Sequence, residues 1–107
     1  MRGHVIIAGY GRVGEVVTAA IEATGTPYVA LDLNASRVTE ARAAGKNVIF
    51  GDASRQEMLE RVGADRASAF VVTADLAAET DRTVATILKH WPEARVFARA
   101  RDTEHAI

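Results

Sequence analysis

Five short apolar runs alternate with amphipathic stretches along the 107 residues, and this alternation constrains the fold more than any other feature of the sequence. The runs are rich in β-branched residues, which is typical of strands that are buried on both faces of a sheet. The stretches between them carry apolar residues at helical spacing. Strands that are separated by helices require right-handed crossovers, and their sheet is therefore parallel. The predicted strands are residues 4–8, 27–32, 47–50, 68–73 and 95–99.

This pattern predicts an α/β fold, a Rossmann-like doubly wound parallel sheet of five or six strands in three layers, because helices cover both faces of the sheet. We expect the strand order 3-2-1-4-5. The sixth strand of the complete fold is missing, and Asp102 has the character of an N-cap for a helix that has barely begun at Ile107. We therefore interpret residues 1–107 as a single domain excised from a longer protein.

Glycine, proline and capping residues predict where the helices begin and end. Gly25 ends the first helix, and Asn34 caps the second. Ser54 and Glu57 have the spacing of a capping box for the third helix, and Pro92 ends the fourth. The predicted apolar stripe of the first helix consists of Val13, Val16, Val17, Ala20 and Ile21.

Composition and charge exclude several classes of function. Thirteen basic and fourteen acidic residues give a net charge of −1, so the broad basic surface of a nucleic-acid-binding protein is missing. The lack of cysteine excludes disulfides, thiolate catalysis and cysteine-ligated zinc. The three histidines are scattered, so we expect no metal site, and no catalytic triad can be argued. Neither a membrane span nor a secretory leader is visible, which indicates a cytoplasmic domain.

A glycine-rich loop, GYGRVG at residues 9–14, follows the first strand and opens the first helix. Gly9 permits the tight turn, Gly11 lets the backbone approach a pyrophosphate, and Gly14 lets the helix pack closely on the sheet. The free N–H groups at the start of the helix would point at the phosphates. Asp32 ends the second strand, where its carboxylate can accept both ribose hydroxyls and repel a 2′-phosphate. The spacing therefore favours NAD or a plain adenine nucleotide over NADP.

Further candidates follow the third and fourth strands, because open α/β sheets bind ligands at the carboxyl ends of their strands. Asp52 and Ala53 either face an adenine edge or belong to a loop that enters a helix. Thr73 and Ala74 would border the nucleotide, whereas Asp75 is better interpreted as a helix cap.

Three arginines are candidates for binding an anion. Arg12 lies in the glycine loop and either pairs with a phosphate or is solvated. Arg99 and Arg101 follow the fifth strand, where they suit an anionic ligand, an acidic partner surface or plain solvent exposure.

These segments together resemble the RCK N-terminal (TrkA-N) domain, from His4 to about His105. The resemblance is carried by HVIIAGYGRVG, by LDLN at 31–34, by VIFGDAS at 48–54 and by ARARDTEH at 98–105. The GDA triplet is a narrower signature than the glycine loop. ARARD narrows the resemblance further, toward the cytosolic domain of Kef-type glutathione-gated potassium/proton antiporters.

The resemblance implies regulation rather than catalysis. It implies a domain that binds NAD or NADH, or AMP, ADP or ATP, and that forms a homodimer through the C-terminal side of its sheet. The domain would control a potassium channel or antiporter in the same or a partner chain, at the cytoplasmic face of the cell membrane. Arg99 and Arg101 match arginines near the dimer interface, so one of them would contact glutathione. The predicted cofactor-binding residues are Gly9, Tyr10, Gly11, Arg12, Val13, Gly14, Asp32, Leu33, Gly51, Asp52, Ala53, Thr73, Ala74 and Arg99.

Two other functions remain open on the residues alone. The first is the cofactor-binding fragment of an NAD-dependent dehydrogenase, which the sequence opposes because it has no substrate domain and no partner for hydride transfer. The second is a methyltransferase-like domain that binds a sulfonium cofactor. The GDA segment and the position of the third glycine speak against it.

Overall fold

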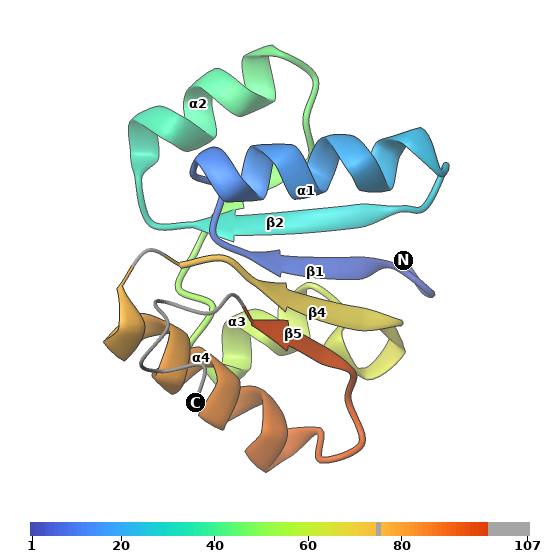
Figure 1. Ribbon diagram of the computed structural model, residues 1–107, viewed down its shortest axis with the longest axis vertical. Helices are drawn as coiled ribbons and strands as arrows, with labels where there is room; N and C mark the ends of the chain where they lie inside the picture. The colour runs from blue at the N-terminus through green and yellow to red at the C-terminus, as the bar shows by residue number, and fades with distance from the viewer. Residues whose placement is uncertain (75, 99–107) are drawn as a thin grey trace, which may run out of the picture.

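Five parallel strands form the centre of the structure, a computed structural model that describes residues 1–74 and 76–98 (Figure 1). The strands pair in the order β3-β2-β1-β4-β5, which confirms the expected order. The elements along the chain are β1 (Val5–Ala8), α1 (Arg12–Ala23), β2 (Tyr28–Asp32), α2 (Ala35–Ala43), β3 (Val48–Phe50), α3 (Gln56–Arg61), the 3-10 helix η1 (Ala64–Arg66), β4 (Ala69–Val72), α4 (Ala77–His90) and β5 (Val96–Ala98).

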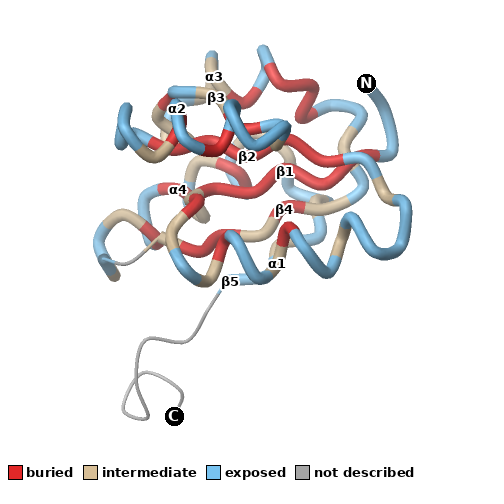
Figure 2. Tube along the Cα trace, turned by 90° about the horizontal axis from the view of Figure 1, so that it is seen from above, coloured by how far each residue is buried: buried red, intermediate tan, exposed pale blue. Residues whose placement is uncertain are grey.

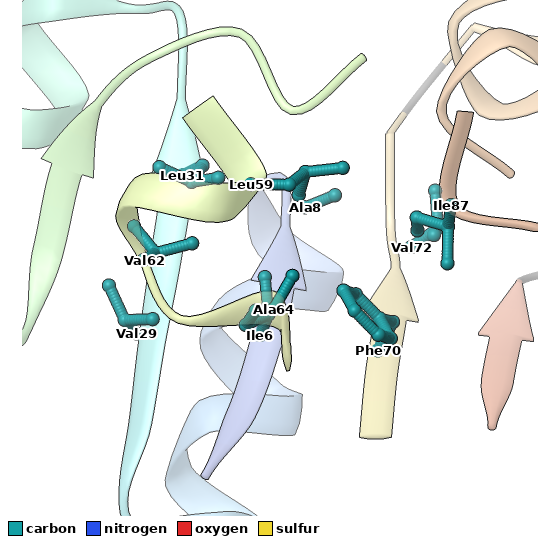
Figure 3. Packing of buried hydrophobic residues seen from close by; sticks show 10 residues of the cluster. All are labelled: Ile6, Ala8, Val29, Leu31, Leu59, Val62, Ala64, Phe70, Val72 and Ile87. Carbon is teal, nitrogen blue, oxygen red and sulfur yellow. The ribbon is translucent and has the colours of Figure 1, made fainter. Parts of the chain in front are cut away.

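Helices cover both faces of the sheet, so the fold has the three predicted layers. One core lies between the sheet and the pair α3 and α4, and Figure 3 shows how its side chains pack. The other core lies between the sheet and the pair α1 and α2. In β1, Ile6 and Ala8 face the first core and Val5 and Ile7 face the second. Because helices cover both faces, β1 and β2 are buried along their length, whereas β4 alternates buried and intermediate residues (Figure 2).

The helix ends follow the sequence signals with one exception. The Asn34 side chain accepts a hydrogen bond from the backbone N–H of Arg37, as expected of an N-cap. The predicted capping box is wrong. Ser54 lies before Arg55, the N-cap of α3, which makes no side-chain cap bond. The Ser54 hydroxyl instead donates to Asp52 at 2.7 Å, because that carboxylate is a stronger acceptor two residues away.

The predicted apolar stripe of α1 is only half right. Val16 is 66% exposed and Ala20 is exposed, whereas Gly14 and Thr18 are buried against the sheet. The cause is the close approach that Gly14 allows, because a Cβ there would meet the carbonyl oxygen of Gly9. The helix turns its smallest side chain toward the sheet, and part of its apolar face turns outward.

Several expectations fall on residues that the structure does not describe. Asp75, Arg99, Arg101 and the helix expected from Asp102 lie outside the described residues. Within residues 1–74 and 76–98, every helix is too short or too polar to cross a lipid bilayer.

Candidate functional site

A cavity of about 570 Å³ opens at the carboxyl ends of the strands, and loops that follow β1, β2, β3 and β4 line it. The cavity lies where the strand order reverses. The chain runs from β1 outward to β2 and β3 on one side of β1, and then returns to β4 on the other side of β1. Open α/β sheets bind ligands at this point, and the volume is in the range of small-molecule sites. The loops that follow these four strands therefore meet at one cavity.

The glycine loop forms the floor of this cavity. Gly9 has a φ of +108°, and a Cβ on it would lie 2.7 Å from the hydroxyl of Thr73. That hydroxyl donates to the carbonyl oxygen of Gly9 at 2.9 Å and so ties the end of β4 to the loop. Gly11 lines the cavity and is the N-cap of α1, and no side chain of the described residues caps the helix there. The first N–H groups of α1 and its positive dipole end are therefore available to an anion.

Asp32 lies at the end of β2 and joins two of the loops. Its side chain is 8% exposed and lines the cavity. One carboxylate oxygen, Oδ2, accepts hydrogen bonds from the backbone N–H of Tyr10 at 2.7 Å and from Nη1 of Arg37 at 3.2 Å. The other, Oδ1, accepts from the backbone N–H of Asn34 at 2.8 Å. The acid thus orders the β1–α1 and β2–α2 loops as well as presenting negative charge to the cavity.

Asp52 organises the loop that follows β3. Its Oδ1 accepts from the N–H and the hydroxyl of Ser54 at 2.9 and 2.7 Å. The hydrogen bond from the Ser54 hydroxyl is the main cause of a lowered pKa at Asp52, and the positive charges of Arg55 and Arg82 act in the same direction. The carboxylate is therefore engaged within its own turn, which holds Ala53 at the cavity wall.

The structure brings most of the predicted binding residues to the cavity. The ones that line it are Gly9, Gly11, Asp32, Leu33, Gly51, Asp52, Ala53, Thr73 and Ala74. The other loop positions act elsewhere. The Tyr10 side chain is buried between the sheet and the α1–α2 layer, where burial raises its pKa, and Arg12 is exposed on the first turn of α1. Val13 is half-buried and Gly14 packs against the glycine turn. Arg99 and Arg101 lie outside the described residues.

Several lining residues have no counterpart among the predictions. They are Ala8 and Leu31 on the strands, and Asn34, Arg37, Ser54, Leu76, Glu79, Arg82 and Thr83 beyond the strand ends. The signal for Arg37 is present in the sequence, because a helix capped by Asn34 places the third helical residue at the end that faces the strand termini. The signal for the α4 residues is weak. Apolar periodicity begins at Val84, although the helix begins seven residues earlier at Ala77.

The glycine turn, the open helix end and the acid at the end of β2 can now be compared with known proteins. A family model described as the TrkA-N domain matches residues 5–107. The chain belongs to the TrkA-N domain family. This TrkA-N domain is 36% identical over 107 residues to K(+) efflux antiporter 2, chloroplastic, of Arabidopsis thaliana, and the match covers 100% of the chain and 9% of that relative. It is 33% identical over 104 residues to the glutathione-regulated potassium-efflux system protein KefC of Escherichia coli O139:H28, which covers 97% of the chain and 17% of that relative.

Solved structures of related domains share the fold. The Shewanella denitrificans Kef CTD in its AMP-bound form is 37% identical with a TM-score of 0.83, over 96% of this TrkA-N domain and 61% of that chain. GsuK bound to ADP is 27% identical with a TM-score of 0.81, over 94% of this domain and 26% of that chain. The GsuK channel bound to NAD, at 16% identity and a TM-score of 0.84 over 98% of this domain and 19% of that chain, shows the shared fold alone.

Proposed function

We propose that this TrkA-N domain is a regulatory domain that binds NAD(H) or an adenine nucleotide and thereby controls a potassium transport system. The observation that carries the proposal is the cavity in which the uncapped start of α1 and the Asp32 carboxylate both face the same space. The AMP-bound Kef relative supports the choice of ligand. The names of the relatives, which are potassium efflux proteins, favour regulation of transport over a dehydrogenase fragment.

The residues of the cavity fit a nucleotide in three parts. The glycine turn would hold a phosphate, because Gly9 and Gly14 leave no room for a Cβ and Gly11 starts an uncapped helix. Asp32 would accept hydrogen bonds from the ribose. Leu33 and Leu76, both exposed apolar side chains on the lining, together with Ala53, would contact the adenine.

Regulation would act through a shift between two arrangements of a homodimer. The cavity is built from four loops that follow four different strands, so a bound nucleotide would add contacts between segments that belong to different strand ends. A ligand that prefers one arrangement stabilises it by its difference in affinity. The chain spans 9% and 17% of the two efflux relatives, and we place it in a corresponding longer transport protein at the cytoplasmic face of a membrane.

A thermal-unfolding series with a panel of nucleotides tests the proposal. AMP, ADP and NAD at about 100 times their Kd should stabilise the fold by about 2.7 kcal/mol, which raises the Tm by several degrees. NADPH and S-adenosylmethionine should produce no comparable shift. If no adenine nucleotide raises the Tm, the domain does not have the proposed binding function. Equal stabilisation by NADPH would refute the role given to Asp32.

Potassium flux in vesicles that contain the longer transport protein tests the regulatory half of the proposal. The nucleotide that raises the Tm should also change the flux, and Asp32→Ala should move that change to a higher nucleotide concentration. A flux that is indifferent to nucleotide would contradict regulation even where binding is retained.

A further inference from the structure

We propose that Arg37 competes with the ribose of the bound nucleotide for the Asp32 carboxylate, and that it thereby sets how much the 2′-hydroxyl contributes to affinity. This inference rests on the proposed nucleotide-binding function and adds a specificity-determining residue to it.

The argument begins with the hydrogen-bond acceptors of Asp32. A carboxylate has about four acceptor positions, two on each oxygen. The oxygen Oδ2 uses both, for the Tyr10 N–H and for Nη1 of Arg37. The oxygen Oδ1 uses one, for the Asn34 N–H. A single acceptor position therefore remains on a carboxylate that is to receive the two hydroxyls of a ribose.

The three donors differ in how easily they can leave. Two are backbone N–H groups, and their release would require the loops around Tyr10 and Asn34 to change conformation. The third is the end of a flexible side chain that is 41% exposed, and its hydrogen bond, at 3.2 Å, is the longest of the three. An ion pair with this exposure is weak, because water competes for both partners. Arg37 is therefore the donor that a ribose can displace.

The position of Arg37 makes the Asp32 carboxylate the main attraction for its charge. It is the third residue of α2, and the positive end of the helix dipole disfavours a cation in the first turn. No other ion pair of Arg37 is found among the residues that the structure describes. Once displaced from Asp32, its guanidinium remains at the cavity lining and can exchange back when the ligand leaves.

The competition predicts a dependence on the sugar. A ribonucleotide that uses both hydroxyls must displace Arg37, so the gain from its 2′-hydroxyl is offset by the loss of the ion pair. A 2′-deoxynucleotide needs one acceptor and leaves Arg37 in place. The unmodified domain should therefore discriminate weakly between the two, and removal of Arg37 should increase the discrimination.

Isothermal titration of AMP and 2′-deoxy-AMP into the domain and its Arg37→Met variant tests this inference. The readout is the ratio of the Kd of 2′-deoxy-AMP to the Kd of AMP, since the loss of a positive charge near the phosphate affects both ligands alike and cancels. We expect the ratio to rise by up to about fivefold in Arg37→Met, on the scale of one partly exposed ion pair. Arg42→Met is the matched control, because Arg42 is on the same helix, donates to the carbonyl of Val48 and does not line the cavity. Its ratio should not change.

Three outcomes would overturn the inference. An unchanged ratio in Arg37→Met would mean that Arg37 does not occupy the acceptor of the ribose. A lower ratio would mean that Arg37 itself bonds the 2′-hydroxyl. Failure of the unmodified domain to bind either nucleotide would refute the proposed function and this inference with it, whereas binding with an unchanged ratio refutes the inference alone. Arg37→Leu, which likewise has no hydrogen-bond donor, is the second variant if Arg37→Met does not fold, and the same rise is expected.

Discussion

Replacing Asp32 with alanine should weaken both nucleotide binding and the fold, because this side chain holds two loops together in addition to facing the cavity. The Tyr10 N–H would be left buried without its acceptor, which costs about 1–3 kcal/mol. The partly exposed ion pair with Arg37 adds about 0–1 kcal/mol, and the Asn34 N–H can turn to water. The free energy of unfolding should therefore fall by about 1–4 kcal/mol. A domain of this size has about 5–15 kcal/mol available, so the variant should remain folded.

The same substitution should reduce the affinity for AMP by about 1–3 kcal/mol, or about 5- to 150-fold in Kd, because charged hydrogen bonds to the ribose are lost. Urea unfolding measures the first effect and isothermal titration measures the second. Glu40→Ala is the control, since it removes an exposed acid from α2 that does not line the cavity. An Asp32→Ala variant that binds AMP as tightly as the unmodified domain would show that the ribose lies elsewhere. An unchanged urea midpoint would contradict the role of Asp32 in holding the loops.

Two further substitutions, Gly14→Ala and Asp52→Asn, test contacts that hold the loops around the cavity. Gly14→Ala would bring a Cβ against the carbonyl of Gly9, so we expect a loss of about 1–3 kcal/mol in urea unfolding together with weaker AMP binding; full retention of both would contradict the close approach of α1. The second is Asp52→Asn. The pKa of Asp52 is lowered from 3.8 in the folded state, so its contribution to stability is complete above the unfolded pKa and is lost as the pH falls through the folded one. The decline in urea midpoint below about pH 4 should be shallower in Asp52→Asn, and an identical decline in both proteins would refute this.

The alternation of strands and helices and the position of the glycine turn were predictable because they depend on local signals. The predicted strands, such as residues 4–8, are apolar at consecutive positions. Such a continuous run is typical of a strand in a sheet that helices cover on both faces. The glycines at 9, 11 and 14 mark a turn into a helix wherever the chain is placed. The position of Asp32 beside the glycine turn then follows from the parallel pairing, because β2 lies next to β1 and both strands end at the same edge of the sheet.

The two wrong predictions, the apolar stripe of α1 and the capping box of α3, concern residues whose environment depends on another segment of the chain. Apolar spacing placed Val16 on the inner face of α1, but the helix is turned by the contact between Gly14 and Gly9, which no periodicity within the helix reveals. The capping box failed for a similar reason. Ser54 has a choice of partners, and Asp52, brought near by the turn, is the better one.

The order of residues alone was enough to predict a doubly wound parallel sheet, the glycine turn after β1 and the acid at the end of β2, since each is encoded by neighbours in the chain. Folding in three dimensions was needed to place the first turns of α4 at the cavity wall, beside the loops that follow β2 and β3. Such contacts join segments whose separation depends on how closely helices approach the sheet. That distance is set by close packing in the core, which depends on side chains from many segments of the chain and not on neighbours in the sequence.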